Sequence, residues 1–176
     1  LISNRRAPIA KKIYAELDGS SPILKLTKEQ SGALETTLNQ TQKEDEYKCF
    51  VVMRCWDPRA EDVIKDVQLY APDEVILMPL YPQYSAATSG SSIKEWKDVC
   101  KKNRYHVKTS TICCYPTDQN FINAHTKEII KKIKDLRDFK LIFSAHGLPE
   151  KNIKKGDPYQ WQVEQSVKRI VENLNY

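Results

Sequence analysis

A histidine at the predicted end of a β-strand is the residue best placed to do chemistry. His146 lies in the stretch Phe143-Ser144-Ala145-His146-Gly147-Leu148-Pro149, directly after the apolar run 141–143. Ligands of open α/β sheets bind outside the carboxyl ends of the strands, so this imidazole would face a ligand, and Gly147 leaves room for a bulky one. A neutral imidazole, with a pKa of about 6.5, accepts protons or binds metal ions near neutral pH. The alternative is a turn histidine satisfied by its neighbours.

Aromatic and polar side chains follow the other predicted strands. Tyr81-Pro82-Gln83-Tyr84-Ser85 is followed by the hydroxyl-rich stretch 88–92, and two further strands end in Arg54-Cys55-Trp56 and Cys113-Cys114-Tyr115. Together they predict a cleft with aromatic walls at one edge of the sheet. The stretch 88–92 could instead cradle a phosphate, but its spacing matches neither G-x-x-x-x-G-K-[ST] nor G-x-G-x-x-G. Two rigid aromatic side chains suit a flat apolar ligand better.

A second polar group lies near the start of the chain. Arg5, Arg6, Tyr14 and Ser21 place guanidinium, phenol and hydroxyl groups within one predicted helix and turn. Arginine binds carboxylates through a two-pronged fork, so a flat ligand with carboxylate arms would use both groups. A solvated helix start is the alternative interpretation.

Four predicted strands alternate with predicted helices to position these residues. β-rich apolar runs predict strands at 47–53, 74–80, 105–113 and 141–144. The first two helices are expected over 8–17 and from a capping box at 27–30 to residue 40. A third begins after Asp57-Pro58, and a fourth ends near residue 103. The last two begin after Thr117 or Asp118 and after Asp157-Pro158. The inward face of the last helix is expected to comprise Val163, Val167, Ile170, Val171 and Leu174. This alternation predicts an α/β fold of the doubly wound type with parallel sheets.

Composition excludes several classes of protein. The net charge of +5 comes from 28 Lys and Arg against 23 Asp and Glu, and the lysines are scattered instead of clustered as in a nucleic-acid footprint. No run of about 18 apolar residues and no secretory leader is seen, so we expect a soluble chain. Five cysteines without C-x-x-C spacing indicate reduced thiols in a cytosol-like compartment.

The strand–helix series predicts two domains, 1–104 and 105–176, joined by a polar link at residues 103–106. The second domain contains only two strands, which is too few for a complete domain. The chain also begins at Leu1 instead of methionine. We therefore expect a fragment that lacks N- and C-terminal parts.

Taken together, these motifs resemble the ferrochelatase family, whose members insert ferrous iron into a porphyrin in haem biosynthesis. The resemblance extends over essentially all 176 residues. It rests on Arg5-Arg6-Ala7-Pro8, Gly19-Ser20-Ser21-Pro22-Ile23, Met53-Arg54, residues 81–85, Gly90-Ser91-Ser92, residues 144–149 and Gly156-Asp157-Pro158-Tyr159. It implies two similar α/β domains that face each other across a porphyrin cleft, the first without its opening strand and the second incomplete in this chain.

The resemblance also implies roles for individual residues. His146 matches the metal-site histidine of the family and is expected to be the catalytic and metal-binding residue. Its acidic partner would lie beyond Tyr176. The residues that match porphyrin-binding positions are Arg6, Tyr14, Ser21, Arg54 and Tyr81. Ferrous iron would be a substrate, together with protoporphyrin IX, and the product would be protohaem. The other two histidines, His106 and His125, are expected to be structural.

Some positions depart from the family pattern. Cys55 replaces a tyrosine of some members, and Asp57-Pro58 replaces histidine-proline. Tyr115 and Asp118 stand where some members have tryptophan and histidine, which puts a second proton-handling histidine in doubt. Members with an iron–sulfur cluster carry a cysteine directly after the serine of residues 81–85. Ala86 occupies this position here, so no cluster is predicted.

The implied mechanism needs a base or metal ligand above the centre of a bent porphyrin. His146 would accept the ring protons or bind the metal, and Arg6, Ser21 and Tyr81 would supply about 1–5 kcal/mol of strain from remote binding energy. Three alternatives stay open: a cobalt-inserting chelatase, a porphyrin or haem carrier without chemistry, and a nucleotide-binding module that uses residues 88–92. Also open are a coproporphyrin substrate, the oligomeric state, and peripheral association of a cytoplasmic protein with the inner membrane.

Overall fold

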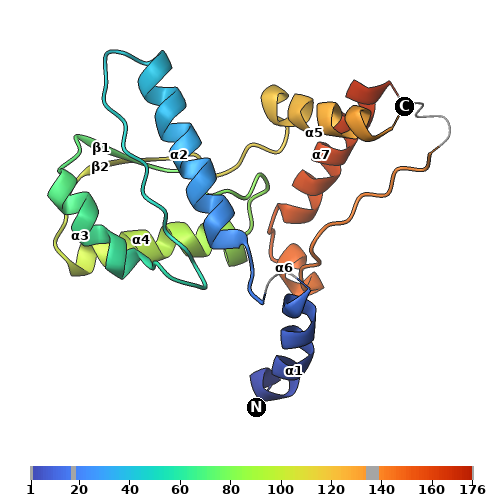
Figure 1. Cartoon of the computed structure of the whole chain (residues 1–176), viewed down its shortest axis with the longest axis horizontal. Helices are drawn as coiled ribbons and strands as arrows, with labels where there is room; N and C mark the ends of the chain where they lie inside the picture. Colours follow the sequence, from blue (N-terminus) through green and yellow to red (C-terminus); the bar gives the residue numbers. More distant parts are fainter. Residues whose placement is uncertain (1, 17–18, 134–138, 176) are drawn as a thin grey trace. The chain divides into compact units, whose positions relative to one another are not determined.

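The computed structural model describes residues 2–16, 19–133 and 139–175. Its elements are α1 (Ile2–Ala15), α2 (Ile23–Thr41), α3 (Ala60–Tyr70), β1 (Glu74–Leu77), the π-helix η1 (Ala86–Gly90), α4 (Ser91–Lys102), β2 (Lys108–Thr111), α5 (Gln119–Lys132), α6 (Glu150–Lys154) and α7 (Tyr159–Leu174) (Figure 1). The chain divides into two compact units, Leu1–Val63 and Ile64–Tyr176. No helix within the described residues is both long and apolar enough to cross a bilayer.

The sheet is small and parallel. β1 and β2 pair in register from Glu74 opposite Lys108 to Leu77 opposite Thr111. The pairing continues past the strands, because the N–H of Ile112 donates to the carbonyl of Leu77 at 2.9 Å. Lys108 Nζ lies 2.6 Å from Glu74 Oε2 across the ladder. The expected α/β class with a parallel sheet is therefore confirmed, with strands shorter than 74–80 and 105–113.

The prediction of a strand at 47–53 is wrong, because in the described residues its backbone groups bond to side chains of α2 and to the nearby carbonyl of Pro58 instead of a neighbouring strand. Asn39 of α2 accepts from the N–H of Tyr47 at 2.9 Å and donates to its carbonyl at 2.8 Å. The N–H of Cys49 donates to Glu35 Oε2 at 2.7 Å, and that of Met53 to the carbonyl of Pro58. β-propensity keeps the segment extended, but a strand also needs a backbone partner.

The strand predicted at 141–144 is also wrong, since among the described residues only β1 and β2 form a ladder. Leu141 packs against the core cluster of Ile122, Ile170 and Leu174, whereas the next side chain, Ile142, is 86% exposed. An apolar run predicts an extended backbone and cannot specify which strand lies beside it.

Three helix starts differ from the sequence-based prediction, and the first is that of α1, which begins at Ile2 instead of residue 8. α2 begins at Ile23, and the Thr27 hydroxyl donates to the carbonyl of Ile23 inside the helix, so Thr27 is not an N-cap. α3 begins at Ala60 instead of directly after Asp57-Pro58. The start of α5 is confirmed, because Asp118 Oδ1 accepts from the N–H groups of Asn120 and Phe121 at 3.0 Å each.

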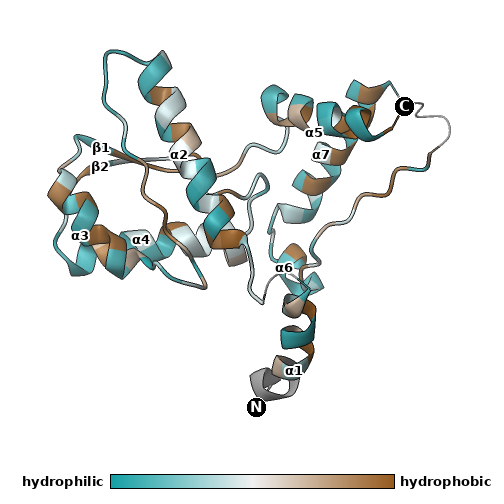
Figure 2. Ribbon diagram, in the orientation of Figure 1, coloured by the Kyte–Doolittle hydropathy of each residue, from teal (hydrophilic) through white to brown (hydrophobic). Residues whose placement is uncertain are grey.

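Helix α7 packs on α5 through a narrower apolar face than predicted. Its buried residues are Gln162, Ser166, Ile170 and Leu174. Ile170 and Leu174 contact Ile122 of α5, as expected, whereas Val163, Val167 and Val171 are only half-buried. Polar and apolar residues both occur along α7 (Figure 2). The buried face is apolar in its second half and polar in its first, where it meets residues 81–85.

We predict that Glu35 makes the free energy of unfolding decrease at acidic pH. The hydrogen bond from the Cys49 N–H, followed by Lys48 at 3.2 Å, holds the pKa of Glu35 below its usual value. A carboxyl group of this kind stabilises the folded state above its unfolded pKa of about 4.3, and the stabilisation is lost as the pH falls through the folded pKa. In urea denaturation, the free energy of unfolding should therefore fall more steeply below about pH 4 for the wild type than for Glu35→Gln, by up to about 1 kcal/mol.

The exposed carboxyl group of Glu29 on the same helix provides the matched control, Glu29→Gln. Parallel stability curves for the wild type and Glu35→Gln between about pH 3 and pH 6 would contradict the assignment.

Candidate active site

Three side chain-mediated hydrogen bonds fix the loop of residues 81–85 around the start of α7, and a fourth fixes Ala86 directly after it. Gln83 Nε2 donates to Ser166 Oγ at 2.9 Å, and the N–H of Tyr84 donates to Gln162 Oε1 at 2.7 Å. Asp157 Oδ2 accepts from Ser85 Oγ and from the N–H of the next residue, both at 2.9 Å. The loop is therefore held by residues that lie 71 to 83 positions away in the chain.

The turn before α7 places Asp157 at this junction. Gly156 has a φ of +89°, a left-handed conformation that glycine adopts without a Cβ clash, and it ends the short helix α6. The other carboxylate oxygen of Asp157 accepts from the N–H of Tyr159 at 3.1 Å. One side chain thus caps the first turn of α7 and anchors Ser85, which is fully buried.

The anchoring roles of Asp157, Gln162 and Ser166 were not predicted from the sequence. A signal was present, since Gln162, Ser166, Ile170 and Leu174 recur every four residues and share one face of α7. Polar residues on the face that continues into the core need partners inside the protein. Ser166 Oγ has two such partners, because it accepts from Gln83 Nε2 and donates to the carbonyl of Pro116 at 2.7 Å.

The π-helix η1 packs tightly behind the loop. Ser89 is fully buried, and Ser91 Oγ donates to the carbonyls of Ala87 and Thr88. A Cβ on Gly90 would lie 2.6 Å from Tyr84 Oη, so only glycine fits there without moving that ring. The Ser91 hydroxyl therefore serves the local fold, whereas the hydroxyls of Thr88 and Ser89 are buried without a hydrogen-bond partner among the described residues.

The residues predicted to bind the flat ligand lie in both compact units. Within Leu1–Val63, Tyr14 of α1 is 40% exposed, Ser21 Oγ is exposed and accepts from the N–H of Ile23, and Arg54 is half-buried. The side chain of Arg6 lies outside the described part of the structure. Within Ile64–Tyr176, Tyr81 is 46% exposed at the start of the anchored loop. Each unit therefore presents one part of the predicted set.

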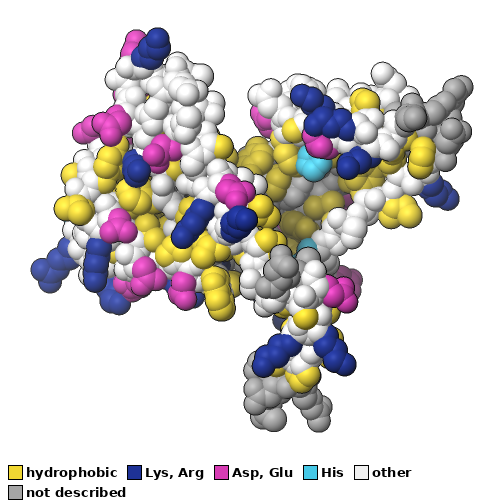
Figure 3. Space-filling view, in the orientation of Figure 1, with side chains coloured by type: hydrophobic (Ala, Val, Ile, Leu, Met, Phe, Trp, Pro, Cys, Tyr) yellow, Lys and Arg dark blue, Asp and Glu magenta, His cyan; other side chains and the backbone are white. Residues whose placement is uncertain are grey.

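His146 is exposed on the extended segment that leads to α6. Beside it, a Cβ on Gly147 would meet nothing within 4 Å, so any need for a glycine there would come from a ligand and not from the fold. Charged side chains are spread over the face drawn in Figure 3, without a basic stripe. The imidazole of His146 is thus free to approach a bound molecule.

The end of β2 lies beside the loop of residues 81–85. The N–H of Tyr115 donates to the carbonyl of Pro82 at 2.8 Å, which joins two of the predicted strand ends as expected. Burial raises the pKa of Tyr115, whose ring packs edge-on against Phe121 at 5.8 Å. Phe121 in turn contacts His125 edge-on at 4.6 Å, which supports a structural role for this histidine.

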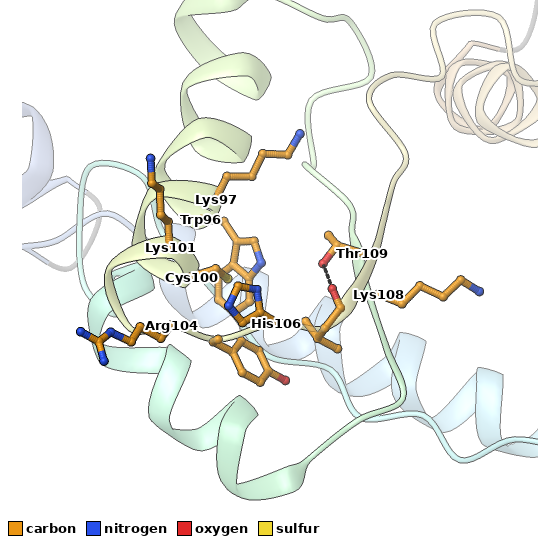
Figure 4. A pocket seen from close by; sticks show the side chains of 10 residues that line it. Trp96, Lys97, Cys100, Lys101, Arg104, His106, Lys108 and Thr109 are labelled. Atoms are coloured by element: carbon orange, nitrogen blue, oxygen red, sulfur yellow. Dashed lines mark hydrogen bonds between the residues drawn. The ribbon is translucent and has the colours of Figure 1, made fainter.

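An open cavity of about 620 Å³ lies between α4 and β2, away from the anchored loop (Figure 4). His106, Trp96 and Cys100 lie side by side in the lining of this cavity. The side chains of four further lining residues extend away from these three: Lys97, Lys101, Arg104 and Lys108. None of the predicted site residues lines the cavity. Among the described residues, no cluster of three or more His, Cys, Asp or Glu side chains could hold a metal ion.

Comparison with known proteins gives one family. The ferrochelatase family model matches residues 1–176. The chain is 86% identical over 175 residues to a ferrochelatase of Pelagibacter ubique, covering 99% of this chain and 51% of that protein. It is 45% identical to ferrochelatases of Hyphomonas neptunium and Rickettsia bellii, covering 93% and 99% of this chain and 46% and 48% of those proteins. The chain thus spans about half the length of these curated relatives.

Proposed function

Because the chain belongs to the ferrochelatase family, we propose that the protein inserts ferrous iron into protoporphyrin IX and releases protohaem, as a step of haem biosynthesis. The family match over all 176 residues, with 86% identity to one ferrochelatase, carries this proposal. The structure supports it with an exposed imidazole, His146, and an exposed tyrosine ring, Tyr81, on a loop fixed by buried polar contacts. Iron and porphyrin are the substrates.

We propose that His146 handles the protons or the metal at the ring centre. A free-base porphyrin carries two N–H protons, and both must leave before four nitrogen lone pairs can bind one metal ion. A neutral imidazole accepts a proton near neutral pH and is also a suitable donor for ferrous iron. The exposed position of His146 supports either task, because a bound ring could reach the imidazole.

The porphyrin would be held by Tyr81 at its face and by Arg6, Tyr14, Ser21 and Arg54 at its edge and carboxylate arms. Ser21 Oγ already accepts from a backbone N–H, so its own hydrogen can be donated to a carboxylate. Tyr14 and Tyr81 expose 40% and 46% of their surfaces. The anchors Asp157, Gln162 and Ser166 act as positioning residues, because they fix the loop that carries Tyr81.

We propose two α/β domains in the complete protein. The boundary at residues 104 and 105 would separate β1 from β2, which share one parallel sheet, so a boundary after β2 fits the pairing better.

Ala86 occupies the position of the cluster cysteine, and its N–H donates to Asp157, so we propose that no iron–sulfur cluster is bound. Five free cysteines favour the cytoplasm as the compartment.

Anaerobic metal insertion by the full-length protein tests this function. Ferrous or zinc ions are added with protoporphyrin IX, and the loss of free-base porphyrin fluorescence is followed over time. We expect catalysed insertion of ferrous iron, with slower reactions for cobalt and for coproporphyrin. Porphyrin binding without insertion of any metal would refute the enzyme and support a carrier, and preference for cobalt would identify a different chelatase.

A further inference from the structure

Two neighbouring cysteines lie beside the anchored loop, and neither takes part in the proposed function. Cys113 and Cys114 follow β2, with their Sγ atoms 3.0 Å apart. Cys113 is exposed and Cys114 is half-buried. The two sulfurs must approach by about 1 Å to reach an S–S bond length of about 2.05 Å, and the bond would close an eight-membered ring that includes the peptide bond between the two residues.

Gln162 connects Cys114 to the loop. Its Nε2 donates to Cys114 Sγ at 3.7 Å, and its Oε1 accepts from the N–H of Tyr84 at 2.7 Å. The glutamine is 9% exposed, so few alternative partners are open to it. The adjoining residue, Tyr115, is bonded to the carbonyl of Pro82 at 2.8 Å. A chemical change at Cys114 would therefore reach the loop through a side-chain contact and through the backbone.

We propose that Cys113 and Cys114 form a site of reversible two-electron oxidation by peroxides, and that closing their disulfide loosens the loop of residues 81–85. The Cys113 thiolate attacks a peroxide oxygen, the O–O bond breaks, and a sulfenic acid and one water result. The Cys114 sulfur then attacks the sulfenic sulfur, forms the S–S bond and expels a second water. Both thiol hydrogens and two electrons pass to one peroxide, and a thiol reductant reverses the change.

The disulfide would change the hydrogen bonds of the Gln162 side-chain amide. Bond formation draws the Cys114 sulfur towards Cys113 and leaves a poorer acceptor for the glutamine amide. The amide must then shift, and the hydrogen bond that its other end accepts from Tyr84 weakens. The effect on porphyrin binding rests on the proposed function, whereas the oxidation and the loosening of the loop do not.

Reactivity of the pair is set by its surroundings. The hydrogen bond with Cys114, followed by burial, raises the pKa of Cys113, so the thiolate is scarce at neutral pH. Excess hydrogen peroxide is therefore the suitable probe. The exposed thiol of Cys55 provides a control site, because it has no neighbouring cysteine in sequence.

The full-length protein is treated with hydrogen peroxide, mapped by peptide mass spectrometry, and then reduced with dithiothreitol. We expect a Cys113–Cys114 disulfide, seen as the loss of both thiol hydrogens in one peptide, and its reversal. Amide hydrogen exchange at Tyr84 should quicken by about threefold to tenfold in the oxidised protein, and porphyrin affinity should fall by a similar factor. Cys113→Ser should abolish these responses, and Cys55→Ser should keep them.

Each outcome decides one part of the proposal. Oxidation of Cys113 to a sulfinic acid without a disulfide would overturn the site. A disulfide that leaves exchange at Tyr84 unchanged would overturn the coupling to the loop. If neither redox form binds porphyrin, the proposed function fails, while mapping and hydrogen exchange still decide the oxidation and the loosening of the loop.

Discussion

Replacement of His146 by alanine is expected to lower the rate of metal insertion by about 10²–10⁴-fold and to leave porphyrin affinity within about threefold. The imidazole is exposed beside Gly147, so its loss should affect the chemistry and not the fold. Anaerobic insertion rates and fluorescence titration with protoporphyrin IX measure the two effects separately.

His106→Ala is the matched control for this experiment. His106 is also exposed, but it lines the cavity between α4 and β2, where no predicted site residue lies. We expect its insertion rate to stay within about twofold of the wild type. An unimpaired His146→Ala protein would move the chemistry to another residue, and a variant that no longer binds porphyrin would assign His146 to binding.

The second large effect is expected for Asp157→Ala, which should lower the free energy of unfolding by about 2–3 kcal/mol. The carboxylate accepts from Ser85 Oγ and from the N–H groups of Ala86 and Tyr159. Ser85 is fully buried, so its hydroxyl would be left without this acceptor in a site that water does not reach. Urea denaturation measures the loss, and KM for porphyrin should rise because the loop that carries Tyr81 is freed.

Two further variants separate this effect from a general loss of charge. Asp157→Asn keeps one acceptor oxygen and should cost about half as much. Asp98→Ala removes an exposed carboxylate that pairs with Lys94 within α4, and it should cost less than about 1 kcal/mol. Equal losses for Asp157→Ala and Asp98→Ala would show that the junction contributes nothing beyond surface charge.

The sequence alone determined those features that depend on neighbours along the chain. Asp118 caps α5 as its position before a helical pattern predicts, and α7 begins directly after Asp157-Pro158. The apolar runs around β1 and β2 were recognised as strands of a parallel sheet. The motifs at residues 81–85 and 144–149 pointed to the family that the comparisons show.

Local patterns failed where the backbone had a choice of partner. Residues 47–53 have the composition of a strand, yet Asn39 and Glu35 of α2 bind their backbone groups. Thr27 has the spacing of a capping box, yet its hydroxyl bonds within a helix that begins one turn earlier. Propensity describes the conformation that a segment prefers, whereas pairing depends on what lies next to it in space.

Only the tertiary structure decided how the candidate site is supported. The bonds from Gln83, Tyr84 and Ser85 to Ser166, Gln162 and Asp157 span 83, 78 and 72 residues. The sequence could identify Tyr81 and His146 as chemically capable, because side-chain type is visible in it. The four-residue spacing of Gln162 and Ser166 with the apolar residues of α7 indicates that these side chains need partners inside the protein, but it cannot identify the loop as that partner, since a hydrogen bond between distant residues exists only once the chain is packed.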